Sequence, residues 1–132
     1  MNYLVGDIGN TSVKISILNY KFNIIKSYNI DTIKLYQKKK INNFFKNFLS
    51  KKINKKVLFS SVVPNAYKVI KKFLNDKNFN SFEIKELKIS KILRINIKNF
   101  NQLGSDRIAN AIGSKKFKNC IVIDFGTATT FD

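Results

Sequence analysis

Histidine and tryptophan are absent from this chain of 132 residues, and cysteine, proline and methionine occur once each. Without histidine, a general base must be a carboxylate, a lysine, a tyrosine or the single thiol. No apolar run approaches the roughly 18 residues of a membrane-spanning helix. The first residues also lack the basic and then apolar segments of a secretion signal. We therefore expect a cytoplasmic protein with no membrane partner, in which Cys120 is a small buried residue at the head of a strand.

Acidic residues are scarce as well: eight Asp and Glu stand against 25 Lys and Arg, for a formal net charge of +17. Clustered basic side chains are typical of nucleic-acid-binding proteins because they neutralise phosphates. Only two of the basic residues are arginine, which nucleic-acid modules favour for its planar fork. The chain is also rich in Asn, Ile and Phe, which share A- and T-rich codons with lysine. A biased genome thus accounts for the charge, and we expect no nucleic-acid partner.

The hydrophobic share of 44% and the twelve Phe indicate a folded domain with a sizeable core. Alternating apolar and polar residues predict three antiparallel strands at the start, followed by alternating helices and strands. The predicted strands cover 2–8, 12–19, 22–30, 57–63 and 119–124, and the predicted helices cover 33–52, a segment opened by Pro64, and 104–117. This order predicts an α/β fold with a mixed sheet covered by helices. Residues 81–99 are ambiguous, with β-like pieces at 82–84 and 95–97.

Apolar residues recur at helical spacing in each predicted helix, and we expect them to pack inward. They are Ile41, Phe44, Phe45, Phe48 and Leu49 in the first helix, Val69, Ile70, Phe73 and Leu74 in the second, and Ile108, Ala109, Ala111 and Ile112 in the third. Asp31 or Thr32 can cap the first helix, and its lysines at 38–40 are expected in solvent.

Two segments of the chain repeat one another: Asp7-Ile8-Gly9-Asn10-Thr11-Ser12 and Asp124-Phe125-Gly126-Thr127-Ala128-Thr129. Each follows an apolar run, so each is predicted to be a strand that ends in a carboxylate and a glycine turn. Glycine lets the backbone approach a ligand closely. The Asn and Thr residues supply donors, and the Asp can hold a divalent ion through water. One such turn is commonly structural, but the pair predicts a site for nucleotide phosphates.

A third segment, Gly104-Ser105-Asp106-Arg107-Ile108-Ala109-Asn110-Ala111, is predicted to open a helix. Ser105 or Asp106 can be a plain N-cap there. In the functional interpretation, Asp106 accepts a proton from a substrate hydroxyl and Arg107 holds an anionic group, with help from backbone amides at the helix start. Phosphoryl transfer asks mainly for orientation of the hydroxyl, which an Asp can provide.

Together, the three segments resemble the type III pantothenate kinase family, within the actin-like, sugar kinase and Hsp70 ATPase superfamily. The resemblance spans the whole chain and matches the N-terminal half of such an enzyme. It implies a ribonuclease H-like (actin-like) domain over 1–132, with the C-terminal domain of the family absent. It also implies transfer of the γ-phosphoryl of ATP to pantothenate, the first step of coenzyme A synthesis. Because the chain stops at Asp132 in a predicted strand, we expect the protein to be longer.

The resemblance assigns roles by motif position. The ATP-binding residues would be Asp7, Ile8, Gly9, Asn10, Thr11, Ser12, Val13, Lys14 and Thr127. Asp7 would organise Mg²⁺, directly or through water, and Asp124 would hold a monovalent cation, K⁺ or NH₄⁺. Pantothenate would be bound by Gly104, Ser105, Asp106 and Arg107, with Asp106 as the catalytic base. The complete enzyme is expected to be a homodimer.

Two positions depart from the family pattern: Ile97 stands where a tyrosine is usual, and Phe100 where a proline is usual. Ile97, the charge of +17 and the stop at Asp132 leave an alternative, an inactive relative that acts as a regulatory or nucleic-acid-associated binding module. Another ATPase or sugar kinase of the superfamily, which shares only the phosphate loops, is a third possibility. The segment from Gly104 to Arg107 argues against it.

Overall fold

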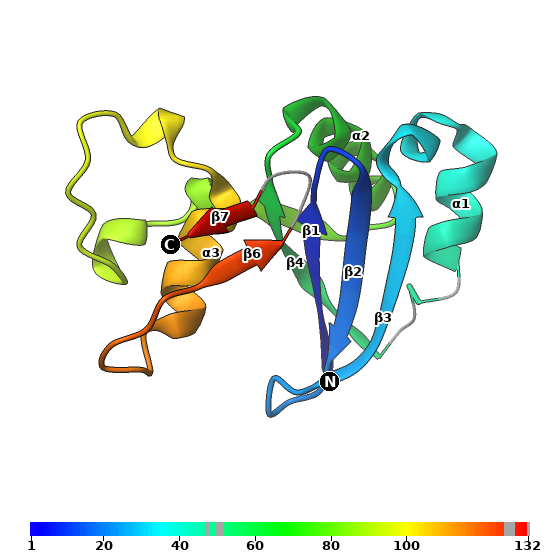
Figure 1. Cartoon of the computed structure of the whole chain (residues 1–132). Helices are drawn as coiled ribbons and strands as arrows, with labels where there is room; N and C mark the ends of the chain where they lie inside the picture. The colour runs from blue at the N-terminus through cyan, green and yellow to red at the C-terminus, as the bar shows by residue number, and fades with distance from the viewer. Residues whose placement is uncertain (47, 50–51, 126–128, 132) are drawn as a thin grey trace.

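A five-stranded mixed sheet is the centre of the fold in this computed structural model, which describes residues 1–46, 48–49, 52–125 and 129–131. Its strand order is β3-β2-β1-β4-β5 (Figure 1). The strands are β1 (Asn2–Ile8), β2 (Ser12–Leu18), β3 (Ile24–Asp31), β4 (Ile53–Ser61) and β5 (Asn80–Glu83). The first three strands pair antiparallel, whereas β4 is parallel to both β1 and β5. The predicted α/β class, with its antiparallel three-stranded start, is confirmed.

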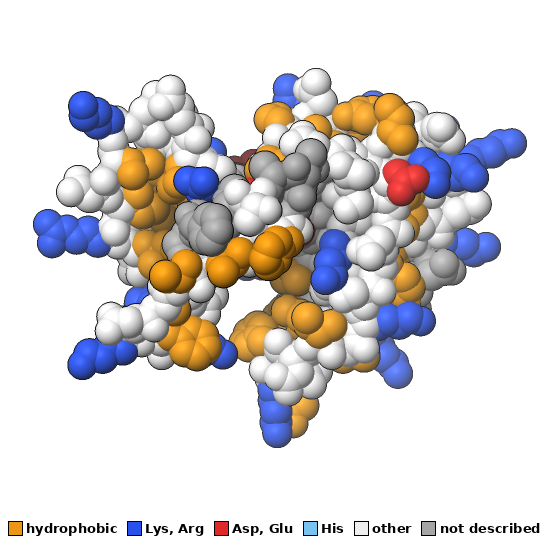
Figure 2. Space-filling view, in the orientation of Figure 1, with side chains coloured by type: hydrophobic (Ala, Val, Ile, Leu, Met, Phe, Trp, Pro, Cys, Tyr) orange, Lys and Arg blue, Asp and Glu red, His pale blue; other side chains and the backbone are white. Residues whose placement is uncertain are grey.

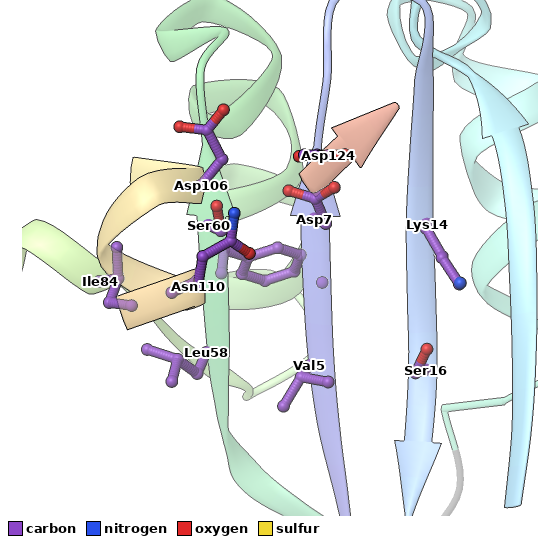
Figure 3. Close-up of a pocket in the computed structure, with 13 residues that line it drawn as sticks. Val5, Asp7, Lys14, Ser16, Leu58, Ser60, Ile84, Asp106, Asn110 and Asp124 are labelled. Carbon is purple, nitrogen blue, oxygen red and sulfur yellow. The ribbon is translucent and has the colours of Figure 1, made fainter. Parts of the chain in front are cut away.

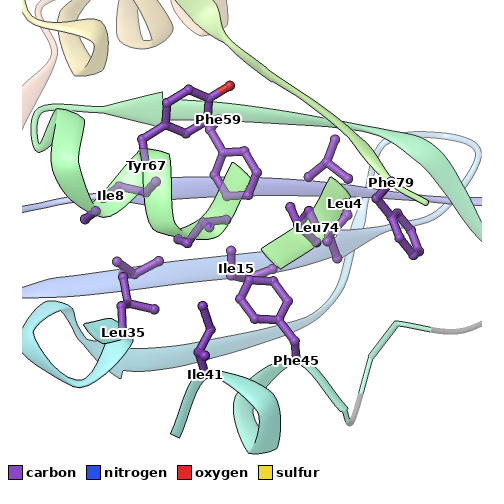
Figure 4. Packing of buried hydrophobic residues seen from close by; sticks show 14 of the residues in the cluster. Leu4, Ile8, Ile15, Leu35, Ile41, Phe45, Phe59, Tyr67, Leu74 and Phe79 are labelled. Atoms are coloured by element: carbon purple, nitrogen blue, oxygen red, sulfur yellow. The ribbon is translucent and has the colours of Figure 1, made fainter. Parts of the chain in front are cut away.

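Helices α1 (Lys38–Lys46) and α2 (Pro64–Asn75) cover one face of this sheet (Figure 4). Strand alternation explains which residues face them: Leu4 and Ile8 of β1 and Ile15 of β2 are almost fully buried. The predicted helix faces supply the other side of this core. The residues confirmed there are Ile41, Phe45, Phe48, Ile70 and Leu74, with Phe44, Leu49, Val69 and Phe73 partly buried against them. The lysines at 38–40 are exposed, as predicted.

The predicted helix over 33–52 is wrong in extent, because the segment is divided. A 3₁₀ helix, η1 (Thr32–Tyr36), comes first, and Gln37 is extended before α1 begins. Asp31 makes no capping hydrogen bond and instead pairs with Lys34 at 2.5 Å. The Thr32 hydroxyl donates to the carbonyl of Gly9 at 2.7 Å, so it is not a cap either. The Thr32 hydroxyl thus binds the β1–β2 turn, which is distant in sequence, instead of capping the helix that follows it.

Helix α3 (Ser105–Ser114) lies beside the sheet with a second, smaller core (Figure 1). There, Ile108 of α3 is buried with Ile84 and Ile89, which belong to the 3₁₀ turns η2 (Ile84–Glu86) and η3 (Ile89–Lys91). A third such turn, η4 (Phe100–Gln102), precedes α3. Residues 82–83 lie in β5, whereas the β-like piece at 95–97 forms no strand. Ala111 is exposed, so its predicted inward packing is wrong.

Strands β6 (Ile123–Phe125) and β7 (Thr129–Phe131) form a separate antiparallel sheet. The strand predicted over 119–124 starts only at Ile123. Its partner β7 ends at Phe131, which is paired with Ile123, so β7 has no residue to pair with positions 119–122. Cys120 therefore lies outside a strand and is exposed, contrary to the prediction of a buried residue. No helix among the described residues has the length and apolar content that crossing a membrane requires.

Gly6 of β1 lies where the sheet is tightly packed. It is paired with Phe59 of β4, whose ring occupies the space beside it. A Cβ added at Gly6 would overlap the Phe59 ring and lie 2.9 Å from Cδ1 of Ile15. Both neighbours are fully buried and have no room to move. We expect Gly6→Ala to lower the free energy of unfolding by about 1–3 kcal/mol, as measured by urea denaturation.

Gly113→Ala is the matched control for this substitution. A Cβ at Gly113 in α3 would meet nothing within 4 Å, and alanine favours the helix by up to about 1 kcal/mol. The control should therefore unfold at the same or higher urea concentration than the parent chain. Equal losses in the two variants would contradict the packing argument.

Candidate active site

A cavity of about 330 Å³ lies between α3 and the sheet face that α1 and α2 leave uncovered. Figure 3 shows the carboxylates of Asp7, Asp106 and Asp124 toward one end, with Val5 and Leu58 toward the other. The remaining lining residues are Gly6, Lys14, Ser16, Phe59, Ser60, Ile84, Ala109 and Asn110. The three carboxylates come from β1, α3 and β6, so the fold brings together one residue from each of the three sequence motifs.

Strand register places three polar side chains abreast on the sheet. Asp7 of β1 is paired with Lys14 of β2 on one side and with Ser60 of β4 on the other. Directly paired residues point to the same face of a sheet, so Lys14 and Ser60 flank Asp7, with the Lys14 ammonium turned away from the carboxylate (Figure 3). The Ser60 hydroxyl is buried and lies close enough to the Asp7 carboxylate to lower the pKa of that carboxyl. A hydroxyl can donate one hydrogen bond and accept others, so it can also contact a ligand in the cavity.

The first glycine loop is held in place by Thr32. The Gly9 amide donates to the Ser12 carbonyl at 3.0 Å, which closes the turn between β1 and β2. Thr32 then binds both sides of this turn, since its hydroxyl donates to Gly9 and its amide donates to the Thr11 carbonyl at 2.9 Å. Such a turn offers backbone groups in fixed positions, which suits the binding of an anion.

The eight predicted ATP-binding residues of this loop fall into three groups. Asp7 and Lys14 line the cavity. The side chains of Ile8 and Val13 are fully buried in the core, so only their backbone can face a ligand. The other members form the turn beyond the cavity lining and are exposed or half-buried; they are Gly9, Asn10, Thr11 and Ser12. The ninth predicted residue, Thr127, lies outside the described residues, as do Gly126 and Asp132.

Gly104 is the N-cap of α3, so the capping role considered for Ser105 or Asp106 is wrong. The Asp106 carboxylate accepts a hydrogen bond from the Arg107 amide at 2.9 Å. A Cβ on Gly104 would overlap this carboxylate, so the glycine leaves space for it beside the helix start. Asp106 faces the cavity, whereas the Ser105 side chain is buried and Arg107 is exposed outside the lining.

Burial is the largest cause that raises the pKa of Asp7 above its ordinary value of 3.8. The negative charges of Asp106 and Asp124 raise it further, while Ser60 and Lys14 oppose the rise. The negative charges of Asp106 and Asp124 thus act on the Asp7 carboxylate in the cavity. A bound cation would relieve this repulsion.

Oxygen ligands of this kind fit hard cations such as Mg²⁺. Within the described part of the chain, however, no three His, Cys, Asp or Glu residues are close enough to hold one ion together. A cation in this cavity would therefore touch one or two of the carboxylates and keep water on its other positions.

Ser60, Ser16 and Asn110 line the cavity without having been predicted. A signal existed for Ser60, because two serines follow the apolar residues of β4 at its carboxyl end, where α/β sheets bind ligands. Ser16 could not have been picked out, because it stands in an ordinary alternating strand with no motif around it. In the structure its hydroxyl lies 2.7 Å from that of Ser27 on the neighbouring strand. Asn110 lies one helical turn after Asp106 on α3, and helical spacing could have indicated it.

Two residues that depart from the family pattern lie before α3. Ile97 is 45% exposed. Phe100 packs against the small core around Ile84 and Ile108. Neither lines the cavity that contains Asp106.

Basic side chains are spread over the face drawn in Figure 2. Most of the Lys and Arg residues visible there lie along the outline of the molecule, more of them on the right, and a few lie within the face. Apolar side chains occupy much of the surface between them. On this face, the charge of +17 therefore does not form one continuous basic surface.

Comparison with known proteins identifies relatives of this chain. A family model described as type III pantothenate kinase matches residues 3–132. A type III pantothenate kinase of Pelagibacter ubique is 41% identical over 131 residues, which cover 98% of this chain and 52% of the relative. Those of Sulfurihydrogenibium sp. and Desulforapulum autotrophicum are 38% and 34% identical, and each match covers 98% of this chain. The chain spans about half the length of these curated relatives.

A solved structure shows the same fold. It is a protein from Cytophaga hutchinsonii described as a sugar kinase, and it matches with a TM-score of 0.50 and 15% sequence identity. The match covers 99% of this chain and 46% of that protein. At this identity the likeness concerns the fold alone, which is that expected of an actin-like domain.

The raised pKa of Asp7 predicts how Asp7→Asn changes stability with pH. Because folding raises this pKa above 3.8, the folded state binds the proton more tightly than the unfolded state. The stability that this provides is complete below pH 3.8 and is lost as the pH rises through the folded-state pKa. Asparagine keeps the shape without the charge, so the variant should be more stable than the parent chain at neutral pH.

Urea denaturation at several pH values measures this difference, which should shrink toward pH 3.8. Asp76→Asn, at the C-terminus of α2 and outside the cavity, is the control; removing a carboxylate there favours the helix by at most about 1 kcal/mol, so its gain should be smaller than that of Asp7→Asn. A loss of stability in Asp7→Asn at neutral pH would show that the carboxylate stabilises the fold.

Proposed function

Because this chain belongs to the type III pantothenate kinase family, we propose that it forms the N-terminal part of a kinase for pantothenate. In the complete protein, the γ-phosphoryl of ATP would pass to the terminal hydroxyl of pantothenate and yield 4'-phosphopantothenate, in the first step of coenzyme A synthesis. The observation that carries the proposal is the shared cavity of Asp7, Asp106 and Asp124. It unites the three motifs on which the family resemblance depends.

ATP phosphates would bind at the loop from Asp7 to Lys14. Support comes from the Lys14 ammonium at the cavity and from the turn that Thr32 holds rigid. Lysine is a suitable point charge for phosphate, and the Ser60 hydroxyl at the cavity can donate to a phosphate oxygen. Thr127 is assigned to the same phosphates by its motif position.

Two cations are part of the proposal: Mg²⁺ near Asp7 and K⁺ or NH₄⁺ near Asp124. When bound, such ions neutralise charge on the phosphates during transfer. The residues present fit them, since the cavity offers carboxylate oxygens whose mutual repulsion a cation lowers. Asp7 and Asp124 would hold the ions chiefly by charge and through water.

Asp106 would act as the base that orients the pantothenate hydroxyl. Helix α3 presents its carboxylate to the cavity, and Gly104 leaves room for that carboxylate to turn toward a substrate. Substrate contacts would also come from Gly104, Ser105 and Arg107. Ser105 is buried, so it would act through its backbone amide. Arg107, exposed at the helix start, would hold the carboxylate of pantothenate or the developing phosphoryl charge.

The proposal includes a C-terminal domain like the second half of the relatives. Support comes from the small β6–β7 sheet, because two strands alone are marginally stable in water. Its apolar residues are open to solvent, with Phe125 81% exposed and Ile123 48% exposed. Such a domain would cover this surface and complete the nucleotide site. We further propose a homodimer, in the cytoplasm, where a free thiol such as that of Cys120 stays reduced.

A chimera tests the proposal and the role of Asp106 together. Residues 1–132 are joined to the second half of the Pelagibacter ubique relative, and phosphorylation of pantothenate is followed by coupled assay. We expect activity that Asp106→Asn lowers by about 100-fold or more, since asparagine cannot accept the proton. The thermal unfolding midpoint and the affinity for ATP should change little, because the amide fills the same space.

Asp76→Asn serves as the control and should retain full activity, since Asp76 lies outside the cavity. Full turnover in Asp106→Asn would rule out its role as the base. An inactive parent chimera that shifts random-sequence DNA at physiological salt would instead support the binding-module alternative.

A further inference from the structure

A second cavity, of about 490 Å³, lies on the opposite side of the molecule's sheet from Asp7, between α1, α2 and β4. It shares no lining residue with the candidate active site. Its lining combines three aromatic rings with three ammonium groups: Phe45, Phe73, Phe79, Lys46, Lys55 and Lys77. We call this the Lys–Phe pocket. Its volume falls within the roughly 300–1,000 Å³ of small-molecule sites.

The aromatic floor of the Lys–Phe pocket is part of the main core and is therefore rigid. Phe45 is fully buried and Phe79 is 4% exposed (Figure 4). The ring of Phe73 on α2 lies 5.0 Å from that of Phe45 on α1, centroid to centroid. Phe45 and Phe79 therefore support the floor from within the core, and the partly exposed ring of Phe73 supplies the aromatic surface that a ligand can reach.

The basic rim comes from three different elements. Lys46 ends α1, Lys55 lies in β4, and Lys77 follows α2. The Lys55 ammonium lies 3.9 Å from the centroid of the Phe79 ring, where cation and aromatic face attract. Charge and apolar surface therefore meet at one point of the pocket.

No carboxylate among the described residues balances this rim. The cavity lining contains no Asp or Glu. Both ion pairs found in the described part of the chain involve other lysines, Lys34 and Lys71. Two amides add polar groups at the edge, those of Asn42 and Asn43. The Asn42 amide nitrogen donates to the Lys38 carbonyl at 2.7 Å, which holds this side chain in place at the edge of the pocket.

From this combination we propose that the Lys–Phe pocket binds a small aromatic anion, a flat ring that carries a phosphate or carboxylate group. The ring would pack on Phe73 and Leu49, and the anionic group would lie among the lysines. A bare inorganic anion would leave the apolar floor unused, and a neutral aromatic would leave three ammonium groups without a partner. The proposal does not depend on the kinase function, because the site lies on the other face of the sheet.

The probe for the test is 1-naphthyl phosphate, titrated into the ¹⁵N-labelled 132-residue chain and followed by NMR and calorimetry. We expect saturable binding, with resonance changes centred on Asn42, Asn43 and the residues around Phe73. Inorganic phosphate and 1-naphthol should each bind at least about tenfold more weakly, a difference of about 1.4 kcal/mol. Inorganic phosphate lacks the aromatic ring, and 1-naphthol lacks the anionic group.

A triple variant, Lys46→Gln with Lys55→Gln and Lys77→Gln, should weaken binding by about tenfold or more. All three side chains are exposed, so the fold should persist, and circular dichroism checks this. The matched control is Lys39→Gln with Lys68→Gln and Lys72→Gln, which removes the same charge outside the pocket. Its affinity should stay within about twofold of the parent chain.

Three results would overturn the proposal. Equal weakening in both triple variants would mean that general surface charge attracts the probe. Resonance changes centred on Asp7 and Lys14 would place the probe in the candidate active site. Shifts that do not saturate would exclude a defined site.

Discussion

Strand β1 has two different neighbours, and the rest of the structure depends on its pairing with both. It is antiparallel to β2 and parallel to β4, with Asp7 abreast of Lys14 and Ser60. The same register turns Leu4 and Ile8 toward α1 and α2. A slip by one residue would exchange the two faces, placing the carboxylate in the core and the apolar side chains in the cavity. The core and the site are therefore specified by one set of hydrogen bonds.

Three of the eight acidic residues in the chain line the cavity on one face of the sheet. Among them, Asp7 is informative: burial, and then the charges of Asp106 and Asp124, raise its pKa despite Lys14 and Ser60. Perturbed carboxylates in a cleft are typical of functional sites. The structure thus keeps negative charge together where stability alone would favour its separation.

The two faces of the sheet carry opposite chemistry, and β4 connects them. Ser60 of β4 faces the acidic cavity, whereas Lys55 reaches the Lys–Phe pocket. Helices α1 and α2 fill most of the space on that second face, and the pocket lies where their phenylalanines meet its edge. The lysine-rich composition explains why positively charged side chains are present around this pocket. Only the arrangement of the elements explains why three lysines surround an aromatic floor.

Sequence by itself determined the strand order at the start, the helix that Pro64 opens, the apolar helix faces and the three motifs, because each depends on residues close together in the chain. It did not reveal the break before α1 at Gln37, the exposure of Cys120 and Ala111, or the place of Ser60 in the cavity. Those features depend on partners distant in sequence, such as the contact of Thr32 with Gly9. Tertiary structure alone decided that Asp7, Asp106 and Asp124 share one cavity, since only strand register and the docking of α3 set the distances between them.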